Sequence, residues 1–359
     1  MNQRMGILGI GTYLPPIVRK NDWWPEEIVS VWRERQARSI TRAQEEPSDP
    51  PTEGMRATLK AMAAYKSDPF EGAVERRVMP DDMKTSDMDV AAAREAIARS
   101  GIDSTQIDLV LAQTSGPNYV HVPNACLVHK ELELSAHCLA ISTEGMCNAF
   151  QQQLALAEQM IVSGRVRYAL LIQSCNMTQF CRPQDPFSAW FGDGATAVIV
   201  GPAAAGRGVL GSAHCTDGSV YGSIVSGIPG KRWWDEGRVV SYLEDAAGAR
   251  LQFLLIAETA KPLLDRALAD AGLERSDIKL WACHQASAWL PRATQEFLGL
   301  EHAHRVETFP WAGSLSGANL PLVLSVAERE GLVHDGDVVA LFSGAAGMQV
   351  SATVLRWGR

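Results

Sequence analysis

The sequence contains no apolar run that could cross a membrane, which in a helix takes about 18 consecutive apolar residues. The apolar stretch nearest the start, Met5–Ile10, is far shorter and is not followed by the cleavage site of a secretory leader. Positive charge is also scarce, with 33 Lys and Arg against 41 Asp and Glu and a net charge of −8. Because phosphate contacts need clustered cations, we expect no nucleic-acid partner. The lack of a long apolar run leads us to expect no membrane partner.

Cysteine is sparse and shows no pairing pattern. There are seven cysteines, an odd number, and no Cys-x-x-Cys pair among them. This usage is typical of free thiols in a reducing compartment, so we expect a cytoplasmic protein. His121, His129 and His137 recur at regular spacing, but no acidic or thiol ligands accompany them. We therefore expect no metal site and no cofactor.

The rest of the composition is that of a globular protein, with 46% apolar and 21% charged residues. It excludes disorder, collagen and coiled coil as descriptions of the whole chain. At about 150 residues per domain, 359 residues allow two similar domains or one large one.

Patterns along the chain predict alternating strands and helices. A buried strand is expected at Gly6–Leu14, and the composition then changes over residues 21–67, which we interpret as an insertion with its own helices. Asp22 is the candidate N-cap of the first of these helices, and residues 45–51 read as a loop. Beyond the insertion we expect helices at 89–100 and 148–163 and strands at 107–113, 168–173 and 196–200. The alternation predicts βαβ units and a parallel sheet.

An internal repeat is the most informative pattern. The helix–strand unit Ala96–Leu109 recurs 171 residues later as Ala267–Leu280, and the same offset relates Tyr168–Leu171 to Val339–Phe342. One ungapped offset that links two separate units indicates a duplication.

The repeat predicts two copies of one α/β unit, residues 1–205 and 206–359. Sites are expected where such units meet, because clefts form there. The same offset relates Cys147 to Ala318, so the segment 311–321 is expected to be the second copy of the turn that carries Cys147.

Cys147 and His284 are the candidates for chemistry. Cys147 lies before a predicted helix and follows Gly145, a setting in which the helix dipole lowers a thiol pKa and favours a nucleophile; the alternative is a buried core cysteine. His284 follows the strand Leu280–Cys283, at the end of a parallel sheet where ligands bind; the alternative is a structural histidine. The glycine-rich loop Phe342–Gly347 offers backbone N–H groups to a reacting oxygen, or is a simple tight turn.

Taken together and in this order, these segments resemble the thiolase superfamily, and most of all β-ketoacyl-acyl-carrier-protein synthase III. The matching segments are the nucleophile turn Cys147–Phe150, the Gly-Asp-Gly signature within Phe191–Ala195, the His-Gln-Ala motif at His284–Ala286, the loop Ser343–Gly347 and the last strand Leu355–Trp357.

The resemblance implies a duplicated five-layer α/β/α/β/α fold and a homodimer. It also implies that an acyl group passes from an acyl-CoA or acyl-carrier-protein thioester to Cys147. His284 would then help to decarboxylate a malonyl thioester, whose enolate attacks the acyl group in a Claisen condensation. The oxyanion hole would consist of the backbone N–H groups of Cys147 and Ala345.

Departures from the family pattern leave the reaction open. Ser314 takes the place of the family's catalytic asparagine, and Asn319 lies five residues further on. Phe70 aligns with the residue that clamps the CoA adenine, while Trp289 and Arg292 stand where carrier-protein contacts are expected. These residues are the predicted substrate-binding set.

Three hypotheses follow from these residues. The first is a ketosynthase III-like condensing enzyme in specialised metabolism. The second is an acyltransferase in which His284 deprotonates an alcohol or amine that attacks acyl-Cys147, an alternative that Ser314 favours. The third is an inactive partner subunit of a heterodimer.

Overall fold

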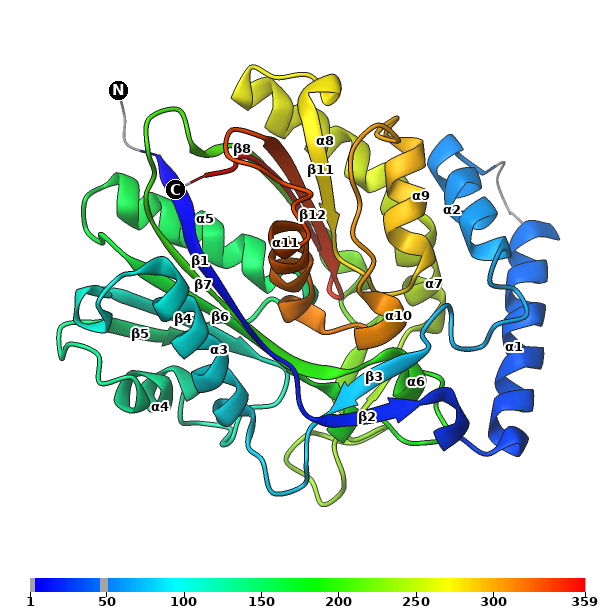
Figure 1. Cartoon of the computed structure of the whole chain (residues 1–359). Coiled ribbons are helices and arrows are strands. Elements are labelled where there is room, and N and C mark those ends of the chain that lie inside the picture. Colours follow the sequence, from blue (N-terminus) through cyan, green and yellow to red (C-terminus); the bar gives the residue numbers. More distant parts are fainter. Residues whose placement is uncertain (1–3, 46–50, 359) are drawn as a thin grey trace.

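The computed structural model describes residues 4–45 and 51–358. Two sheets organise the chain (Figure 1). The first has the order β1 (Met5–Tyr13), β7 (Asp193–Pro202), β6 (Ala169–Asn176), β4 (Leu109–Thr114) and β5 (Leu139–Ser142). The second has the order β11 (Ile278–Cys283), β12 (Val338–Ala345), β13 (Gln349–Arg356) and β8 (Gly208–Thr216). Two short ribbons complete the strands: β2 (Ile17–Lys20) with β3 (Glu75–Val78), and β9 (Val225–Gly227) with β10 (Val240–Tyr242).

The two sheets have matching topology. In the first, β4 is parallel to β5 and β6, whereas β7 is antiparallel to both β6 and β1. In the second, β11 is parallel to β12, and β13 is antiparallel to both β12 and β8. Beside β11, Leu280 forms a parallel bridge with His304. This bridge takes the position in the second sheet that β5 has beside β4 in the first. The prediction of a parallel sheet is therefore wrong for two strands of each sheet, because buried antiparallel strands also read as continuous apolar runs.

Helices form three layers, one on the outer face of each sheet and one between the two sheets (Figure 1). The outer face of the first sheet is covered by α3 (Thr85–Ser100) and α4 (Asn124–Glu131). Between the sheets lie α5 (Ala149–Val162) and α11 (Asn319–Arg329). The outer face of the second sheet is covered by α7 (Ala246–Leu254), α8 (Ile256–Ala271) and α9 (Trp289–Phe297). The result is the five-layer α/β/α/β/α arrangement that the family resemblance implies.

The central helices define the main core. Phe150 and Leu154 of α5 and Leu320 and Val323 of α11 are buried against apolar side chains of both sheets. All four are at most 2% exposed. Because one layer of helices serves two sheets, the starts of α5 and α11 are fixed from both sides.

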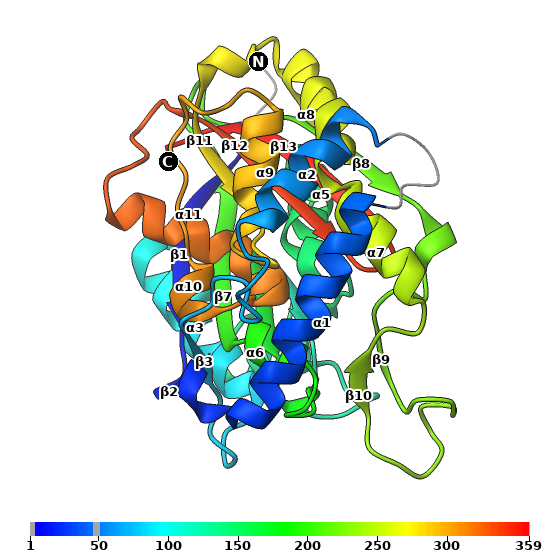
Figure 2. The ribbon, with the colours of Figure 1, turned by 90° about the vertical axis from the view of Figure 1, so that its right-hand side faces the viewer.

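The segment predicted as an insertion forms two helices, α1 (Glu26–Glu45) and α2 (Glu53–Ala63); α2 packs against α9, and α1 packs against α2 (Figure 2). Asp22 does not cap α1: it lies in a 3-10 turn, and the helix begins at Glu26, after Pro25. Of the predicted loop 45–51, residues 46–50 lie outside the described residues. Two short helices, α6 (Phe187–Trp190) and α10 (Phe309–Ala312), pack against this segment through Ala189 and Phe309.

None of the helices in the described ranges combines the length and the hydropathy that crossing a bilayer requires. Within the same ranges, which include all seven cysteines, no disulfide is formed.

Candidate active site

Cys147 lies in a strained turn at the start of α5. The turn is a single 3-10 turn, Met146–Asn148, and α5 follows at Ala149. Gly145 has φ of 139° and Met146 has φ of 45°, so the chain reverses sharply before the cysteine. The N–H of Asn148 closes the turn on the carbonyl of Gly145 at 2.9 Å. The sequence prediction of a tight turn before a helix is therefore confirmed.

A second turn of the same kind packs against the first. It is the 3-10 turn Ser316–Ala318 before α11, and Ser316 has φ of 50°. A Cβ on Gly317 would lie 2.7 Å from the carbonyl oxygen of Met146, so a larger residue would force the two turns apart. Because Met146 and Ser316 open equivalent turns, Cys147 corresponds to Gly317 and not to Ala318 as the sequence offset suggests.

Ser316 brings a hydroxyl to the sulfur of Cys147, a contact that the sequence interpretation missed. The Cys147 thiol donates a hydrogen bond of 3.7 Å to Oγ of Ser316. Burial raises the pKa of Cys147 to about 11, although its hydrogen bonds with Ser316 and with the backbone oppose the shift. The predicted lowering of this pKa by the helix dipole is wrong because desolvation of the thiolate is the larger effect.

His284 follows β11 directly, as predicted. Its backbone N–H donates to the carbonyl of Phe342 on β12 at 2.8 Å, and its side chain is 2% exposed. Neither ring nitrogen has a hydrogen-bond partner in the part of the chain that the structure describes. Burial lowers the pKa of His284 to about 4, so the imidazole is neutral at pH 7. It can donate one hydrogen bond and accept another.

The neighbour of His284 is locked by the rest of the fold. The side-chain oxygen of Gln285 accepts from the N–H groups of Thr308 and Phe309, and its Nε2 donates to the carbonyl of Val306. The backbone N–H of Gln285 donates to Oδ1 of Asn319 at 2.6 Å. Asn319 therefore serves the backbone beside His284, which makes it a poor substitute for the family's catalytic asparagine.

Ser314 is held by its backbone against the Gly-Asp-Gly segment. Its N–H donates to the carbonyl of Trp190 at 2.7 Å, and its carbonyl accepts from Gly192 at 3.1 Å. A Cβ on Gly192 would lie 2.1 Å from the carbonyl oxygen of Ala312, which explains the glycine. The Oγ of Ser314 is buried and has no hydrogen-bond partner among the described residues.

Ala345 ends β12, and its carbonyl accepts a hydrogen bond of 2.9 Å from Nε2 of Gln252. Two residues earlier on β12, Oγ of Ser343 donates to Oδ1 of Asn148 at 2.6 Å. Phe342 of β12 accepts the backbone hydrogen bond of His284. The same strand therefore contacts both His284 and the turn of Cys147. The elements predicted to carry the nucleophile, the histidine and the oxyanion loop meet at this end of β12.

The three predicted substrate-binding residues differ in their burial and in their contacts. Phe70 is 9% exposed, and its ring packs against those of Trp24 and Trp32 at centroid distances of 5.9 and 6.3 Å. This packing leaves no open ring face for an adenine, so the structure gives the Phe70 assignment no support. Trp289 is 3% exposed and donates to a carboxylate oxygen of Glu71 at 3.1 Å.

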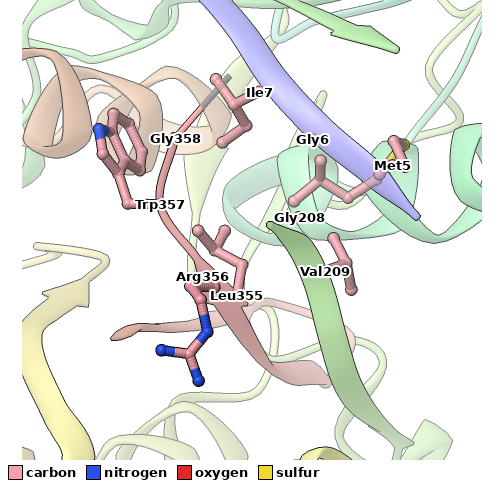
Figure 3. Close-up of a pocket in the computed structure, with 10 residues that line it drawn as sticks. Met5, Gly6, Ile7, Gly208, Val209, Leu355, Arg356, Trp357 and Gly358 are labelled. Atoms are coloured by element: carbon pink, nitrogen blue, oxygen red, sulfur yellow. The ribbon is translucent and has the colours of Figure 1, made fainter. Parts of the chain in front are cut away.

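Of the three, Arg292 alone is exposed, and it pairs with Glu296 at 2.7 Å. A small cavity of about 10 Å³ lies between β1, β8 and the end of β13 (Figure 3). It is lined by none of the predicted site residues. Over residues 4–45 and 51–358, no group of His, Cys, Asp and Glu side chains is arranged to hold a metal ion.

Two family models and a curated relative are similar to this chain in sequence. Residues 142–218 match the family model of 3-oxoacyl-[acyl-carrier-protein (ACP)] synthase III, and residues 268–357 match the model of its C-terminal part. The β-ketoacyl-[acyl-carrier-protein] synthase III of Geobacillus kaustophilus is 29% identical over 289 residues, covering 80% of this chain and 88% of that protein.

Solved structures are similar over the whole length. The synthase III of Thermus thermophilus has a TM-score of 0.77 at 25% identity, covering 98% of this chain and 99% of that one. The priming β-ketosynthase of the R1128 polyketide pathway has a TM-score of 0.79 at 24% identity, covering 99% and 97%. These likenesses confirm the predicted fold class.

Proposed function

The chain belongs to the thiolase superfamily and is similar to 3-oxoacyl-[acyl-carrier-protein] synthase III, and on this premise we propose that it loads an acyl group on Cys147 and condenses it with a malonyl-type thioester. The donor is an acyl-CoA or an acyl-carrier-protein thioester. The single observation that carries the proposal is the contact between the turn of Cys147 and the strand that ends in Ala345.

In the first step the sulfur of Cys147 attacks the thioester carbonyl. A sulfur–carbon bond forms, the bond to the donor sulfur breaks, and the proton of Cys147 leaves with the donor thiol. The negative oxygen of the intermediate is stabilised by the backbone N–H groups of Cys147 and Ala345. Because burial raises the pKa of Cys147 to about 11, the thiol rests neutral, and its proton has to move as the donor binds.

In the second step the malonyl thioester loses carbon dioxide. The electron pair of the broken carbon–carbon bond forms an enolate, which attacks the acyl carbon and releases Cys147. We assign His284 and Ser314 to the enolate oxygen. Buried polar atoms are nearly always hydrogen bonded, so the unpartnered ring nitrogens of His284 and Oγ of Ser314 favour a polar substrate atom beside them.

Ser314 also favours a second function, transfer of the acyl group to an alcohol or amine. A serine hydroxyl is shorter than the amide of an asparagine and offers a single donor. Attack by an alcohol or amine needs a base but no hydrogen-bond donor to an enolate oxygen. The neutral imidazole of His284 has an unprotonated nitrogen that can take the proton of the alcohol or amine. Because Ser314 takes the place of the family's catalytic asparagine, we also place the reaction in specialised metabolism.

We propose a homodimer formed at β5. This strand is the edge of the first sheet, and Leu139 and Ile141 on it are 49% and 40% exposed. The loop after β4 adds Tyr119 and Val120, which are 66% and 68% exposed. An exposed edge strand with an apolar patch beside it is a ready site for pairing with a second copy.

Intact-protein mass spectrometry with a panel of acyl thioesters tests the proposal. We expect the protein to gain the mass of one acyl group and Cys147→Ala to gain none. Cys283→Ala is the control, because Cys283 is another free cysteine, buried in β11 and outside the turn of Cys147. An adduct that persists in Cys147→Ala, or no adduct with any donor, would contradict the proposal.

A further inference from the structure

Asn148 follows Cys147 directly and is buried, with 2% of its surface exposed. Both ends of its amide are hydrogen bonded to the second sheet. Oδ1 accepts from Oγ of Ser343 on β12 at 2.6 Å, and Nδ2 donates to Oγ of Ser351 on β13 at 2.9 Å. Asn148 thus ties the turn that carries the nucleophile to two neighbouring strands.

Gln151, one helical turn further along α5, reinforces the same tie. Its Nε2 donates to Oγ of Ser343 and to the carbonyl of Ser351, each at 2.8 Å. Its Oε1 accepts from Oγ1 of Thr353 at 2.8 Å. The oxygen and the nitrogen of both side-chain amides, Asn148 and Gln151, have hydrogen-bond partners. The network therefore stabilises one arrangement of α5 against β12 and β13.

This tie connects the two backbone donors that the proposed acyl transfer needs. One donor is the N–H of Cys147, adjacent to Asn148, and the other is the N–H of Ala345, two residues beyond Ser343 on β12. The two donors come from elements far apart in sequence, so their separation depends on contacts between α5 and β12. The carbonyl of Ala345 is itself held by Gln252 at 2.9 Å.

We propose that Asn148 is a positioning residue that sets the separation of the Cys147 and Ala345 donors through its hydrogen bond with Ser343. The inference rests on the proposed function, because the two donors matter only if an oxyanion forms at Cys147. Asn148 does not touch the substrate in this account. It acts through the backbone beside it.

Two reactions of the same sulfur separate this role from a structural one. Acylation by a thioester passes through an oxyanion and needs both donors. Alkylation by iodoacetamide displaces iodide at a saturated carbon and forms no oxyanion. We expect Asn148→Ala to slow acylation of Cys147 by about 10- to 100-fold, since misplacement of catalytic groups by about 1 Å has effects of this size. Alkylation of Cys147 should stay within about twofold.

Gln153→Ala is the matched control. Gln153 is also a buried amide of α5, but it faces the first sheet, where it donates to Thr143 and to the carbonyl of Ile172. Both variants lose a buried amide and should be destabilised alike in urea. We expect only Asn148→Ala to lose acylation selectively. Equal acylation in Asn148→Ala and the parent protein, or a matching loss of alkylation, would overturn the inference.

Ser343→Ala removes the other end of the same hydrogen bond and replaces the first variant if Asn148→Ala does not fold. We expect it to slow acylation as well, and the double variant to be no slower than the slower single variant. Additive losses would show that the two side chains act separately and would overturn the inference. Failure of the parent protein to form any adduct would instead contradict the proposed function itself.

Discussion

The hydroxyl of Ser316 lies 3.7 Å from the sulfur of Cys147, although 169 positions separate the two residues in the chain. Each residue belongs to a 3-10 turn that opens with a positive φ and leads into a central helix. The glycine at position 317 allows the two turns to touch. Cys147, the proposed nucleophile, is therefore surrounded in part by the equivalent turn that precedes α11.

The Ser316 hydroxyl should make Cys147 easier to ionise. In the thiol state it accepts from sulfur, and in the thiolate state it can turn and donate, which favours the charged form. Removing it should raise the pKa of Cys147 further, by up to about one unit, the size expected for one hydrogen bond. At a pH below that pKa, alkylation by iodoacetamide should then slow about three- to tenfold.

Ser316→Gly is the variant for this measurement, because glycine adopts φ of 50° without the strain that alanine would have. Ser325→Ala is the control: Ser325 is another fully buried serine of the same region, within α11. The alkylation rate is measured from pH 7 to 10. An unchanged profile in Ser316→Gly would show that the contact does not affect ionisation.

His284→Ala should slow transfer from acyl-Cys147 to the acceptor by about 10²–10⁴, the usual contribution of a positioned proton donor or acceptor. The decay of a preformed Cys147 adduct after acceptor is added gives the rate. Because burial lowers the pKa of His284 to about 4, the parent protein should show no loss from histidine protonation between pH 8 and 5.

The exposed residue His334 provides the control for that experiment, since His334→Ala leaves the surroundings of His284 intact. Equal decay rates in His284→Ala and the parent protein would return His284 to a structural role. A decline in the transfer rate of the parent protein centred near pH 6.5 would show that the imidazole of His284 is more exposed to solvent than in this structure.

Much of the fold could be predicted because the signals are local. The strand before His284 and the helix after Cys147 follow from short apolar patterns, and glycines mark the ends of α3 and α8 with φ of 69° and 65°. Strand direction could not be predicted, since β6 and β7 are both buried runs and differ only in their pairing partners. The domain boundary near residue 205 and the insertion at 21–67 stay predictions.

The site residues named from motifs stay predictions, and the sequence interpretation missed features that depend on contacts between distant residues. The helix dipole at Cys147 can be read from sequence, but the burial that raises its pKa cannot. The repeat offset is 171 residues for α3 and α8 but 170 residues for the two turns. The offset used in the sequence interpretation therefore misaligned the two turns, and the contact of Ser316 was overlooked. The packing of Phe70 against Trp24 and Trp32 could not be predicted, because these contacts join residues that are far apart in the sequence.

Arg76 should be important for stability. It is fully buried, its guanidinium lies 4.7 Å from the ring of Trp24, and it donates to Asn21 and to the carbonyls of Arg19 and Ala189. Burial lowers its pKa to about 10, so it remains charged at neutral pH. Arg76→Ala leaves a cavity and unpartnered acceptors, and should reduce the free energy of unfolding by about 3 kcal/mol.

Urea unfolding followed by tryptophan fluorescence measures that loss. Arg94→Ala is the control, since Arg94 is exposed on α3 and donates to one backbone carbonyl. A change in Arg76→Ala no larger than in Arg94→Ala would show that the guanidinium contributes no net stability.

Ser314 decides between the two proposed reactions. Decarboxylation of a malonyl thioester places negative charge on the thioester oxygen, and two donors are expected to receive it, the imidazole of His284 and one side-chain group. The Oγ of Ser314 is unpartnered and its backbone is fixed between Trp190 and Gly192, so its reach is set by the fold. If a serine hydroxyl is too short, the enolate is poorly stabilised and acceptor transfer dominates.

We expect Ser314→Asn to raise carbon dioxide release from a malonyl thioester, and Ser314→Ala to leave acylation of Cys147 nearly intact. Carbon dioxide release and the mass adduct on Cys147 are measured side by side for both variants. The loss of one oxyanion donor is generally worth about 10²–10³ in rate, so a gain of comparable size is the upper bound for Ser314→Asn. Fast release by the parent protein that is lost in Ser314→Ala would show instead that the serine performs the asparagine's role, because no other change in that variant removes a donor. Condensation would then be the native reaction, and the acceptor-transfer alternative would be excluded.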